Sequence, residues 1–283
     1  MNSVEMEDNA QQRLRQAKAF VFDMDGVLYR GGEVLPGVVD LLNALEIRQK
    51  PYMLATNNSM ASPSDYQAKL EAMGIEVPAE RVLTAGTATR DYLRESLPEK
   101  AGIFAVGMPA LREQLFSQTG FRPVQYGEEQ PDAVVVGLDL AFTYDKLKSA
   151  TLAIRNGALF VATNADATLP TENGLVPGAG SIVAAIATAS GREPTIIGKP
   201  SPQILEKAAQ HMGAHPRDVV MIGDRLDTDI LAGHRAGMLT LLVLTGVSTR
   251  EEIAESPVLP DLVFTDLRSV LEALVVEPVE RQP

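Results

Sequence analysis

The sequence lacks cysteine altogether and has only three histidines, His211, His215 and His234, among its 283 residues. Without cysteine the chain has no disulfide, no thiolate nucleophile and no cysteine-based zinc site. With three histidines, all in the last third of the chain, a histidine-rich metal site is not expected either. A metal bound here would therefore be a hard cation held by oxygen ligands.

Basic residues and long apolar runs are also scarce. The chain has 25 lysines and arginines against 37 aspartates and glutamates, a formal net charge of −12. This acidic balance disfavours nucleic acid and anionic membranes as partners. No stretch approaches the roughly 20 apolar residues of a membrane span, and the acidic N-terminal residues do not resemble a secretory signal. We therefore expect a cytoplasmic protein whose partner is a small molecule.

Short apolar runs alternate with amphipathic segments along the chain, which predicts an α/β fold. Because most of these runs are continuously apolar, we expect a doubly wound parallel sheet covered on both faces. The predicted strands are 19–22, 52–55, 103–106, 133–136, 159–162, 195–197, 219–222 and 241–244. The predicted helices include 36–48, 63–73, 144–156, 202–212 and 228–237. Residues 1–16 are either a helical extension or a tail.

Four predicted strands end in polar residues. Asp23 and Asp25 follow the first strand, Thr56 the second, Lys199 the strand at 195–197, and Asp224 the strand at 219–222. Taken singly, each of these motifs is also typical of a turn or a helix cap. Ligands bind at the carboxyl ends of parallel strands, so we expect all four ends along one edge of a sheet. Close carboxylates repel unless a cation lies among them, and a lysine beside hydroxyl and amide donors suits a phosphate.

The combination resembles the haloacid dehalogenase (HAD) superfamily of phosphotransferases over about residues 18–275. The superfamily motifs match at Asp23-x-Asp25-Gly26, Thr56, Lys199-Pro200 and Gly223-Asp224-x4-Asp229. Longer strings are similar to subfamily IIA, the NagD-like or 4-nitrophenylphosphatase-like branch, which includes phosphoglycolate and pyridoxal phosphate phosphatases. These strings are Gly-Lys-Pro-Ser-Pro (198–202), Gly-Asp-Arg-Leu-Asp-Thr-Asp-Ile-Leu (223–231) and Leu-Thr-Gly-Val-Ser (244–248).

The resemblance implies Mg²⁺-dependent hydrolysis of small phosphate monoesters. Asp23 would be the nucleophile that forms an aspartyl-phosphate, and Asp25 the general acid and then the general base. In this superfamily an aspartate two places after the nucleophile goes with phosphatases and mutases, whereas a threonine there goes with ATPases. Two alternatives stay open: a phosphotransferase to another acceptor, and a non-catalytic phosphometabolite-binding protein, although a binding protein has no need of Asp25.

The resemblance also implies a binding role for several further residues. The implied Mg²⁺ ligands are Asp23, Asp224 and the backbone carbonyl of Asp25, with Asp229 supporting the metal site. The implied phosphate-binding residues are Thr56, Asn57 and Lys199. A homodimer or higher homo-oligomer is an expectation at the level of the family.

The spacing of the motifs predicts an inserted domain. Asp25 and Thr56 are 31 positions apart, which leaves no room for an insertion, whereas 143 positions separate Thr56 from Lys199. The excess predicts an inserted α/β cap at 98–178 between core segments at 1–97 and 179–283. The resemblance implies that the core is Rossmann-like and that the cap is of the C2 type.

The predicted cap contains a polar segment, 163–168, that could select the substrate. The candidate specificity residues are Thr163, Asn164, Asp166 and Asp139, with Glu172-Asn173 on a further loop. The string at 163–174 resembles that of phosphoglycolate phosphatases. The substrate does not follow from this string, because specificity changes quickly among such loops. The expected substrate class is small phosphometabolites, with phosphoglycolate, glycerol phosphate and sugar phosphates as candidates, and an ordinary polar turn is the alternative for the segment.

Overall fold

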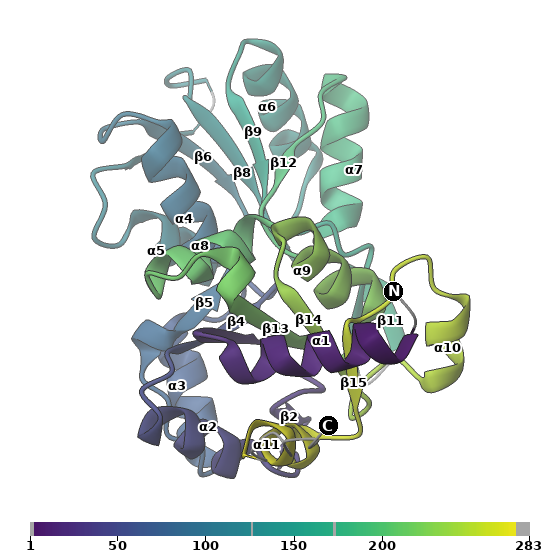
Figure 1. The fold of residues 1–283 in the computed structure, drawn as a ribbon. Helices are drawn as coiled ribbons and strands as arrows, with labels where there is room; N and C mark the ends of the chain where they lie inside the picture. The colour runs from purple at the N-terminus through teal and green to yellow at the C-terminus, as the bar shows by residue number, and fades with distance from the viewer. Residues whose placement is uncertain (1–2, 126, 172–173, 276–283) are drawn as a thin grey trace, which may run out of the picture. The chain divides into compact units, whose positions relative to one another are not determined.

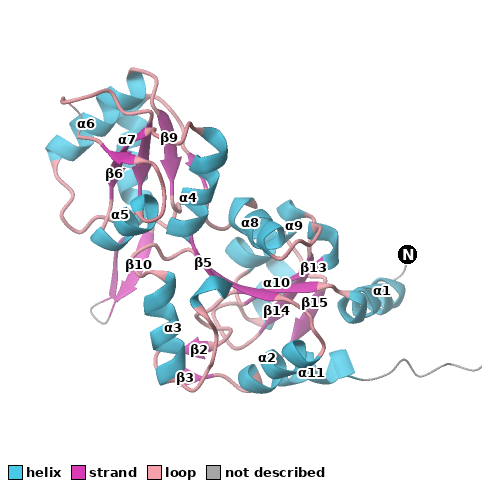
Figure 2. Cartoon of the chain, turned by 90° about the vertical axis from the view of Figure 1, so that its left-hand side faces the viewer, coloured by secondary structure: helices cyan, strands magenta, loops and turns pink. Residues whose placement is uncertain are grey.

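The computed structural model describes residues 3–125, 127–171 and 174–275 (Figures 1 and 2). The chain divides into two compact units. The first comprises residues 1–55, 67–81 and 205–283, and the second comprises 56–66 and 82–204. These units do not coincide with the cap and core limits predicted from the sequence, which remain a prediction.

The first unit contains a parallel sheet. Its strands are β1 (Ala19–Phe22), β4 (Tyr52–Thr56), β13 (Val219–Gly223), β14 (Leu239–Val243) and β15 (Leu262–Phe264). They lie in the order β15, β14, β13, β1, β4, with every neighbouring pair parallel. All of β1 is buried, as expected for a strand covered on both faces. The chain runs from β1 to β4 on one side and later to β13 on the other, so the sheet is doubly wound and β1 and β13 flank its switch point.

Helices and short turns complete the first unit. They are α1 (Ser3–Gln16), α2 (Val38–Ile47), α9 (Leu231–Ala236), α10 (Arg250–Glu255), α11 (Leu267–Val275), the 3-10 turns η1 (Ala79–Arg81) and η2 (Pro216–Asp218), and the hairpin β2 (Tyr29–Arg30) with β3 (Glu33–Val34). Two helices, α3 (Pro63–Ala72) and α8 (Gln203–His211), contain the points at which the two units divide. Helix α11 contacts both α2 and α1, whereas α9 contacts β14.

The helix predicted at 228–237 is interrupted. Residues Leu226–Ile230 form a π-helical turn, η3, before α9 begins at Leu231. The Ile230 N–H donates to the Arg225 carbonyl at 3.1 Å, an i→i+5 bond that widens the turn. Such widened turns are frequent at functional sites.

The second unit has its own parallel sheet. Its strands are β6 (Gly102–Val106), β7 (Arg122–Pro123), β8 (Ala133–Val136), β9 (Leu159–Ala162) and β12 (Thr195–Ile196), in the order β12, β9, β8, β6, β7. The remaining elements are β5 (Val82–Thr84), α4 (Ala85–Ser96), α5 (Pro109–Phe116), α6 (Tyr144–Arg155), α7 (Ala179–Ser190) and the hairpin β10 (Thr168–Thr171) with β11 (Gly174–Pro177). Helices α6 and α7 contact each other and β8, and they bury one apolar cluster between them and the sheet.

The strand before Lys199 belongs to this second sheet, so the expectation that all four polar strand ends share one sheet edge was wrong. β12 pairs in parallel with β9. The pairing continues beyond β12, because the Gly198 N–H donates to the Thr163 carbonyl at 2.8 Å. An apolar run predicts a strand but does not specify its partner, which tertiary pairing decides.

The α/β class and the parallel sheets with flanking helices are confirmed. None of the helices in the described part of the chain combines the length and the hydropathy needed to cross a bilayer.

The packing of α2 on α11 yields a prediction for Gly37. This residue precedes α2 with a φ of 83°, and a Cβ on it would overlap the backbone of Arg268. Gly31 has a φ of 60° but no atom within 4 Å of an added Cβ. Both alanine substitutions incur about 1–2 kcal/mol of backbone strain, and Gly37→Ala adds about 1–3 kcal/mol of overpacking. Urea unfolding should therefore show Gly37→Ala as clearly less stable than Gly31→Ala, and equal stability would contradict the crowding argument.

Candidate active site

Two of the predicted aspartates follow adjacent strands of the first unit. Phe22 lies opposite Ile222 in the pairing of β1 with β13. The ladder continues one residue further, because the Asp23 N–H donates to the Ile222 carbonyl at 2.8 Å. Asp23 and Asp224 therefore both lie at the carboxyl ends of neighbouring strands, where a doubly wound sheet binds its ligands.

Three carboxylates gather at this switch point. One oxygen from each of Asp23, Asp224 and Asp229 lies within 4.8 Å of the others. Asp224 is 2% exposed and Asp229 is 1% exposed, whereas Asp23 is only partly buried. Like charges this close and this buried need a counter-charge. An all-oxygen donor set suits a hard divalent cation such as Mg²⁺, so these residues fit the metal that the sequence predicts.

Asp229 is held by backbone donors. Its Oδ2 accepts hydrogen bonds from the Asp224 N–H and the Arg225 N–H, each at 3.2 Å. A Cβ at Gly223 would overlap the Asp229 side chain, so only glycine allows this close approach. Asp229 thus fixes the turn that carries Asp224, which suits the supporting role predicted for it.

Asp25 is placed differently from the other aspartates. It is exposed, and it lies in a tight turn between buried Met24 and Gly26. Gly26 has a φ of 84°, and its N–H donates to the Tyr29 carbonyl at 2.8 Å. An exposed carboxyl two residues from Asp23 can exchange protons with solvent or with a substrate, as a general acid and base must.

The phosphate-binding residues that the sequence predicts lie in the second unit, where Asn57 connects them. Its Oδ1 accepts from the Lys199 N–H at 2.7 Å, and its Nδ2 donates to the Lys199 carbonyl at 2.8 Å. Both backbone groups of Lys199 are therefore fixed by one carboxamide. The Thr56 Oγ1 accepts from the Asn58 N–H at 3.2 Å, which orders the same loop. The Lys199 residue is 2% exposed.

The predicted specificity segment joins this group. The Asn164 Nδ2 donates to the Asn57 carbonyl at 2.9 Å, and its Oδ1 accepts from the Asp166 N–H at 3.1 Å. The Asn57 Nδ2 also approaches the Asp166 Oδ2 at 3.5 Å. Asn164 and Asp166 are thereby tied to the loop that carries Thr56 and Asn57. Thr163, by contrast, is fully buried.

The geometry supports a structural role for Asp139. Its buried carboxylate accepts from the Lys146 Nζ at 2.7 Å and from the Ala141 N–H at 2.9 Å. Each oxygen of the Asp139 carboxylate therefore has a partner in the segment that follows it. The geometry gives no support for contact between Asp139 and a substrate. Glu172 and Asn173, named with it from the sequence, lie outside the described residues.

Gln114 is a buried residue that sequence reasoning missed. Its Nε2 donates to the carbonyls of Ser59 and Ala61 at 3.3 Å each, and to the Ala110 carbonyl at 2.9 Å. It therefore anchors the loop after Thr56 to α5. A glutamine on a helix carries no sequence signal of burial, so only the tertiary contacts reveal this role.

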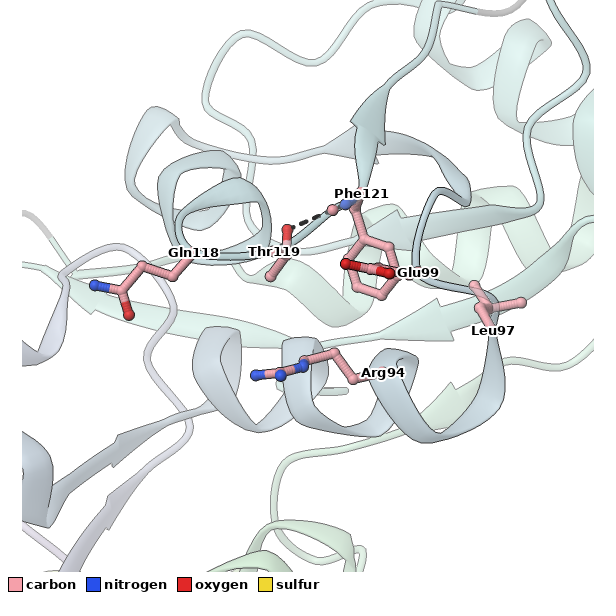
Figure 3. Close-up of a pocket in the computed structure, with 7 residues that line it drawn as sticks. Arg94, Leu97, Glu99, Gln118, Thr119 and Phe121 are labelled. Atoms are coloured by element: carbon pink, nitrogen blue, oxygen red, sulfur yellow. Dashed lines mark hydrogen bonds between the residues drawn. The ribbon is translucent and has the colours of Figure 1, made fainter.

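A hollow of about 420 Å³ lies elsewhere in the second unit (Figure 3). It is lined by Arg94, Leu97, Glu99, Gln118, Thr119, Gly120 and Phe121. Within its lining, the Phe121 N–H donates to the Thr119 Oγ1 at 3.3 Å. Two charged residues line the hollow, Arg94 and Glu99, and both are exposed. Their charges have opposite signs. None of its lining residues is among the predicted site residues, so it is distinct from the groups above.

Two family models match this chain, and each match includes residues of both units. A family model described as haloacid dehalogenase-like hydrolase matches residues 20–122, and one described as HAD-hydrolase-like matches residues 196–270. An acid sugar phosphatase from Staphylococcus saprophyticus is 39% identical over 261 residues, which cover 92% of this chain and 99% of that protein.

Two solved structures share the fold over about nine tenths of this chain. A 4-nitrophenylphosphatase from Thermotoga maritima is 36% identical with a TM-score of 0.85, over 93% of this chain and 99% of that one. A glycerol phosphate phosphatase from Mycobacterium tuberculosis, solved in complex with magnesium, is 37% identical with a TM-score of 0.82, over 91% and 78%.

The carboxylate cluster predicts a selective loss of cation binding. Asp224→Asn removes one buried charge from the cluster, so calorimetric titration should show Mg²⁺ affinity at least about tenfold weaker. Asp227→Asn is the matched control, because Asp227 is exposed in the same segment and pairs with Arg225 at 3.0 Å. Equal Mg²⁺ affinities for the two variants would contradict the assignment of Asp224.

Proposed function

We propose that this chain, which belongs to the haloacid dehalogenase-like hydrolase family, hydrolyses small phosphate monoesters with Asp23 as the nucleophile. The chain is a phosphoric monoester hydrolase by its similarity to phosphatases over about nine tenths of its length. The observation that carries the assignment of Asp23 is its position within the carboxylate cluster, at the carboxyl end of β1. Asp23 is partly exposed, as a group that attacks a substrate must be.

The first step forms a bond between an Asp23 oxygen and phosphorus and breaks the bond from phosphorus to the ester oxygen. The leaving alkoxide takes a proton from the Asp25 carboxyl and departs as an alcohol. The product of this step is an aspartyl-phosphate on Asp23 and an ionised Asp25.

The second step returns both residues to their starting state. Asp25 removes a proton from a water molecule, whose oxygen attacks the phosphorus and releases the Asp23 carboxylate. Inorganic phosphate leaves, and Asp25 is again protonated. The exposed position of Asp25 supports this role, because it must meet a leaving group and then a water molecule.

Asp23, Asp224 and the carbonyl of Asp25 would hold Mg²⁺. Asp229 would support the site by binding the Asp224 N–H and the Arg225 N–H. Bound Mg²⁺ supplies positive charge that offsets the negative charge of the carboxylates and of the phosphate. The geometry of the three carboxylates supports this assignment.

Lys199 and Thr56 are the proposed ligands of the phosphoryl oxygens. An ammonium group and a hydroxyl donor stabilise the charge that the phosphate oxygens carry during transfer. Asn57 contributes mainly by holding the backbone of Lys199, because its carboxamide is already bonded to that backbone at both ends.

Sugar phosphates, glycerol phosphate and phosphoglycolate are the proposed substrates. The acid sugar phosphatase and the glycerol phosphate phosphatase among the similar proteins support the first two. Asp166 is the proposed contact to a leaving group, and Asn164, whose carboxamide is bonded to Asn57 and Asp166, holds the segment that carries it. A panel of phosphorylated metabolites, ranked by kcat/KM with nucleotides and pyridoxal phosphate included, tests this substrate class.

Asp23→Asn should abolish turnover. The amide retains the shape of the carboxylate but is a far poorer nucleophile, so kcat on 4-nitrophenyl phosphate should fall at least about 10³-fold. The unfolding midpoint verifies that the fold is retained. Activity close to that of the parent would overturn the assignment of Asp23.

Removal of divalent cations should also stop turnover. Hydrolysis of 4-nitrophenyl phosphate should disappear with excess EDTA and return when Mg²⁺ is added back. Undiminished hydrolysis in EDTA would contradict the metal role.

Product analysis with an added alcohol separates hydrolysis from phosphoryl transfer, since only a transferase yields the new ester in high proportion.

A further inference from the structure

We propose that residues 245–248, here called the 245–248 loop, together with Arg30, position the Asp224 carboxylate for cation binding. This inference rests on the proposed function, because it concerns the same metal site. The loop belongs to the string that resembles the family at 244–248, to which the sequence assigns no role. All of these residues lie in the first unit.

The 245–248 loop contacts Asp224 directly through its backbone. The Val247 N–H donates to the Asp224 Oδ2 at 2.7 Å, and the Ser248 N–H donates to the Asp224 carbonyl at 3.0 Å. The Ser248 Oγ in turn accepts from the Leu226 N–H at 3.1 Å. The loop therefore fixes both the side chain of Asp224 and the turn that follows it.

Two glycines allow the backbone to lie against this carboxylate. A Cβ on Gly26 or on Gly246 would overlap the Asp224 carboxylate. The same Cβ on Gly26 would lie only 3.1 Å from the Gly246 Cα. The carboxylate is thus confined between the turn that follows Asp25 and the 245–248 loop, and it has little room to rotate.

Arg30 and Thr245 connect these two segments. The Arg30 guanidinium donates to the carbonyls of Thr245 and Gly246, the latter at 3.2 Å. The Thr245 Oγ1 donates to the Gly26 carbonyl at 2.7 Å. The segment that carries Asp23 and Asp25 is therefore bonded to the loop that holds Asp224.

We infer that these bonds hold the Asp224 carboxylate in its metal-binding orientation before the cation binds. A carboxylate accepts about four hydrogen bonds or metal bonds, and the Val247 amide occupies one position on Oδ2. The rest of the carboxylate is then held in one orientation within the cluster of Asp23 and Asp229. Partners that orient a metal ligand typically change metal affinity 10–100-fold when they are removed.

Substitution of Val247 tests the backbone donor. Val247→Pro removes the N–H, whereas Val247→Ala retains it, and the side chain contributes little because Val247 is 63% exposed. Calorimetric titration of the apoprotein with Mg²⁺ should show an affinity at least about tenfold weaker for Val247→Pro than for Val247→Ala. Mg²⁺ affinities within twofold of each other would overturn the proposal.

A second pair covers the case in which Val247→Pro does not fold. Thr245→Val removes the donor to the Gly26 carbonyl, and Thr245→Ser retains it. Thr245→Val should bind Mg²⁺ several-fold more weakly than Thr245→Ser, and equal affinities would then decide against the proposal. A merely structural role would lower the unfolding midpoint equally with and without Mg²⁺, whereas a positioning role reduces the Mg²⁺-induced rise of the midpoint.

Mg²⁺ binding to the parent protein distinguishes a failure of this inference from a failure of the proposed function. If the parent binds Mg²⁺ and Asp224→Asn does not, the metal site stands and the Val247 pair decides the role of the loop. If the parent shows no Mg²⁺ binding, the proposed metal site fails, and the proposal for the loop fails with it.

Discussion

The parallel pairing of β1 with β13 is the constraint on which the rest of the site depends. It brings Asp23 and Asp224 to neighbouring strand ends, and Asp229 joins them within 4.8 Å. Three carboxylates at this separation repel one another, so the fold must supply positive partners. Backbone N–H groups supply part of that compensation: two reach Asp229, and the Val247 N–H reaches Asp224. The proposed divalent cation would add further positive charge at this cluster.

The second unit contains Lys199, the basic residue among the predicted site residues. Lys199 follows β12, and its backbone is fixed by the Asn57 carboxamide. Asn164 and Asp166 are bonded to the same loop, so residues that follow β4, β9 and β12 form one hydrogen-bonded group. The carboxylates thus belong to one unit and the proposed phosphate ligands to the other, and Thr56 at the end of β4 is the first residue of the second unit.

Much of the fold could be predicted because buried parallel strands have a strong signature. The apolar runs at 133–136 and 159–162 coincide with β8 and β9, and the runs at 19–22 and 219–222 lie within β1 and β13. The sheet to which β12 belongs could not be predicted, since pairing is a long-range choice that an apolar run does not encode. The π-helical turn at Leu226–Ile230, with its bond from the Ile230 N–H to the Arg225 carbonyl, was also not predicted.

By itself, the sequence determined which chemical groups follow which strands: Asp23, Asp25, Thr56, Lys199 and Asp224. The tertiary structure decided what holds two of them: the Val247 N–H binds the Asp224 carboxylate, and the Asn57 carboxamide binds the backbone of Lys199. Arg30 holds the loop that carries Val247, through the carbonyls of Thr245 and Gly246. The physical reason is that every residue except proline carries the same backbone donor and acceptor. The path of the chain in space determines which backbone N–H group binds a given carboxylate. The residue types alone do not identify that group.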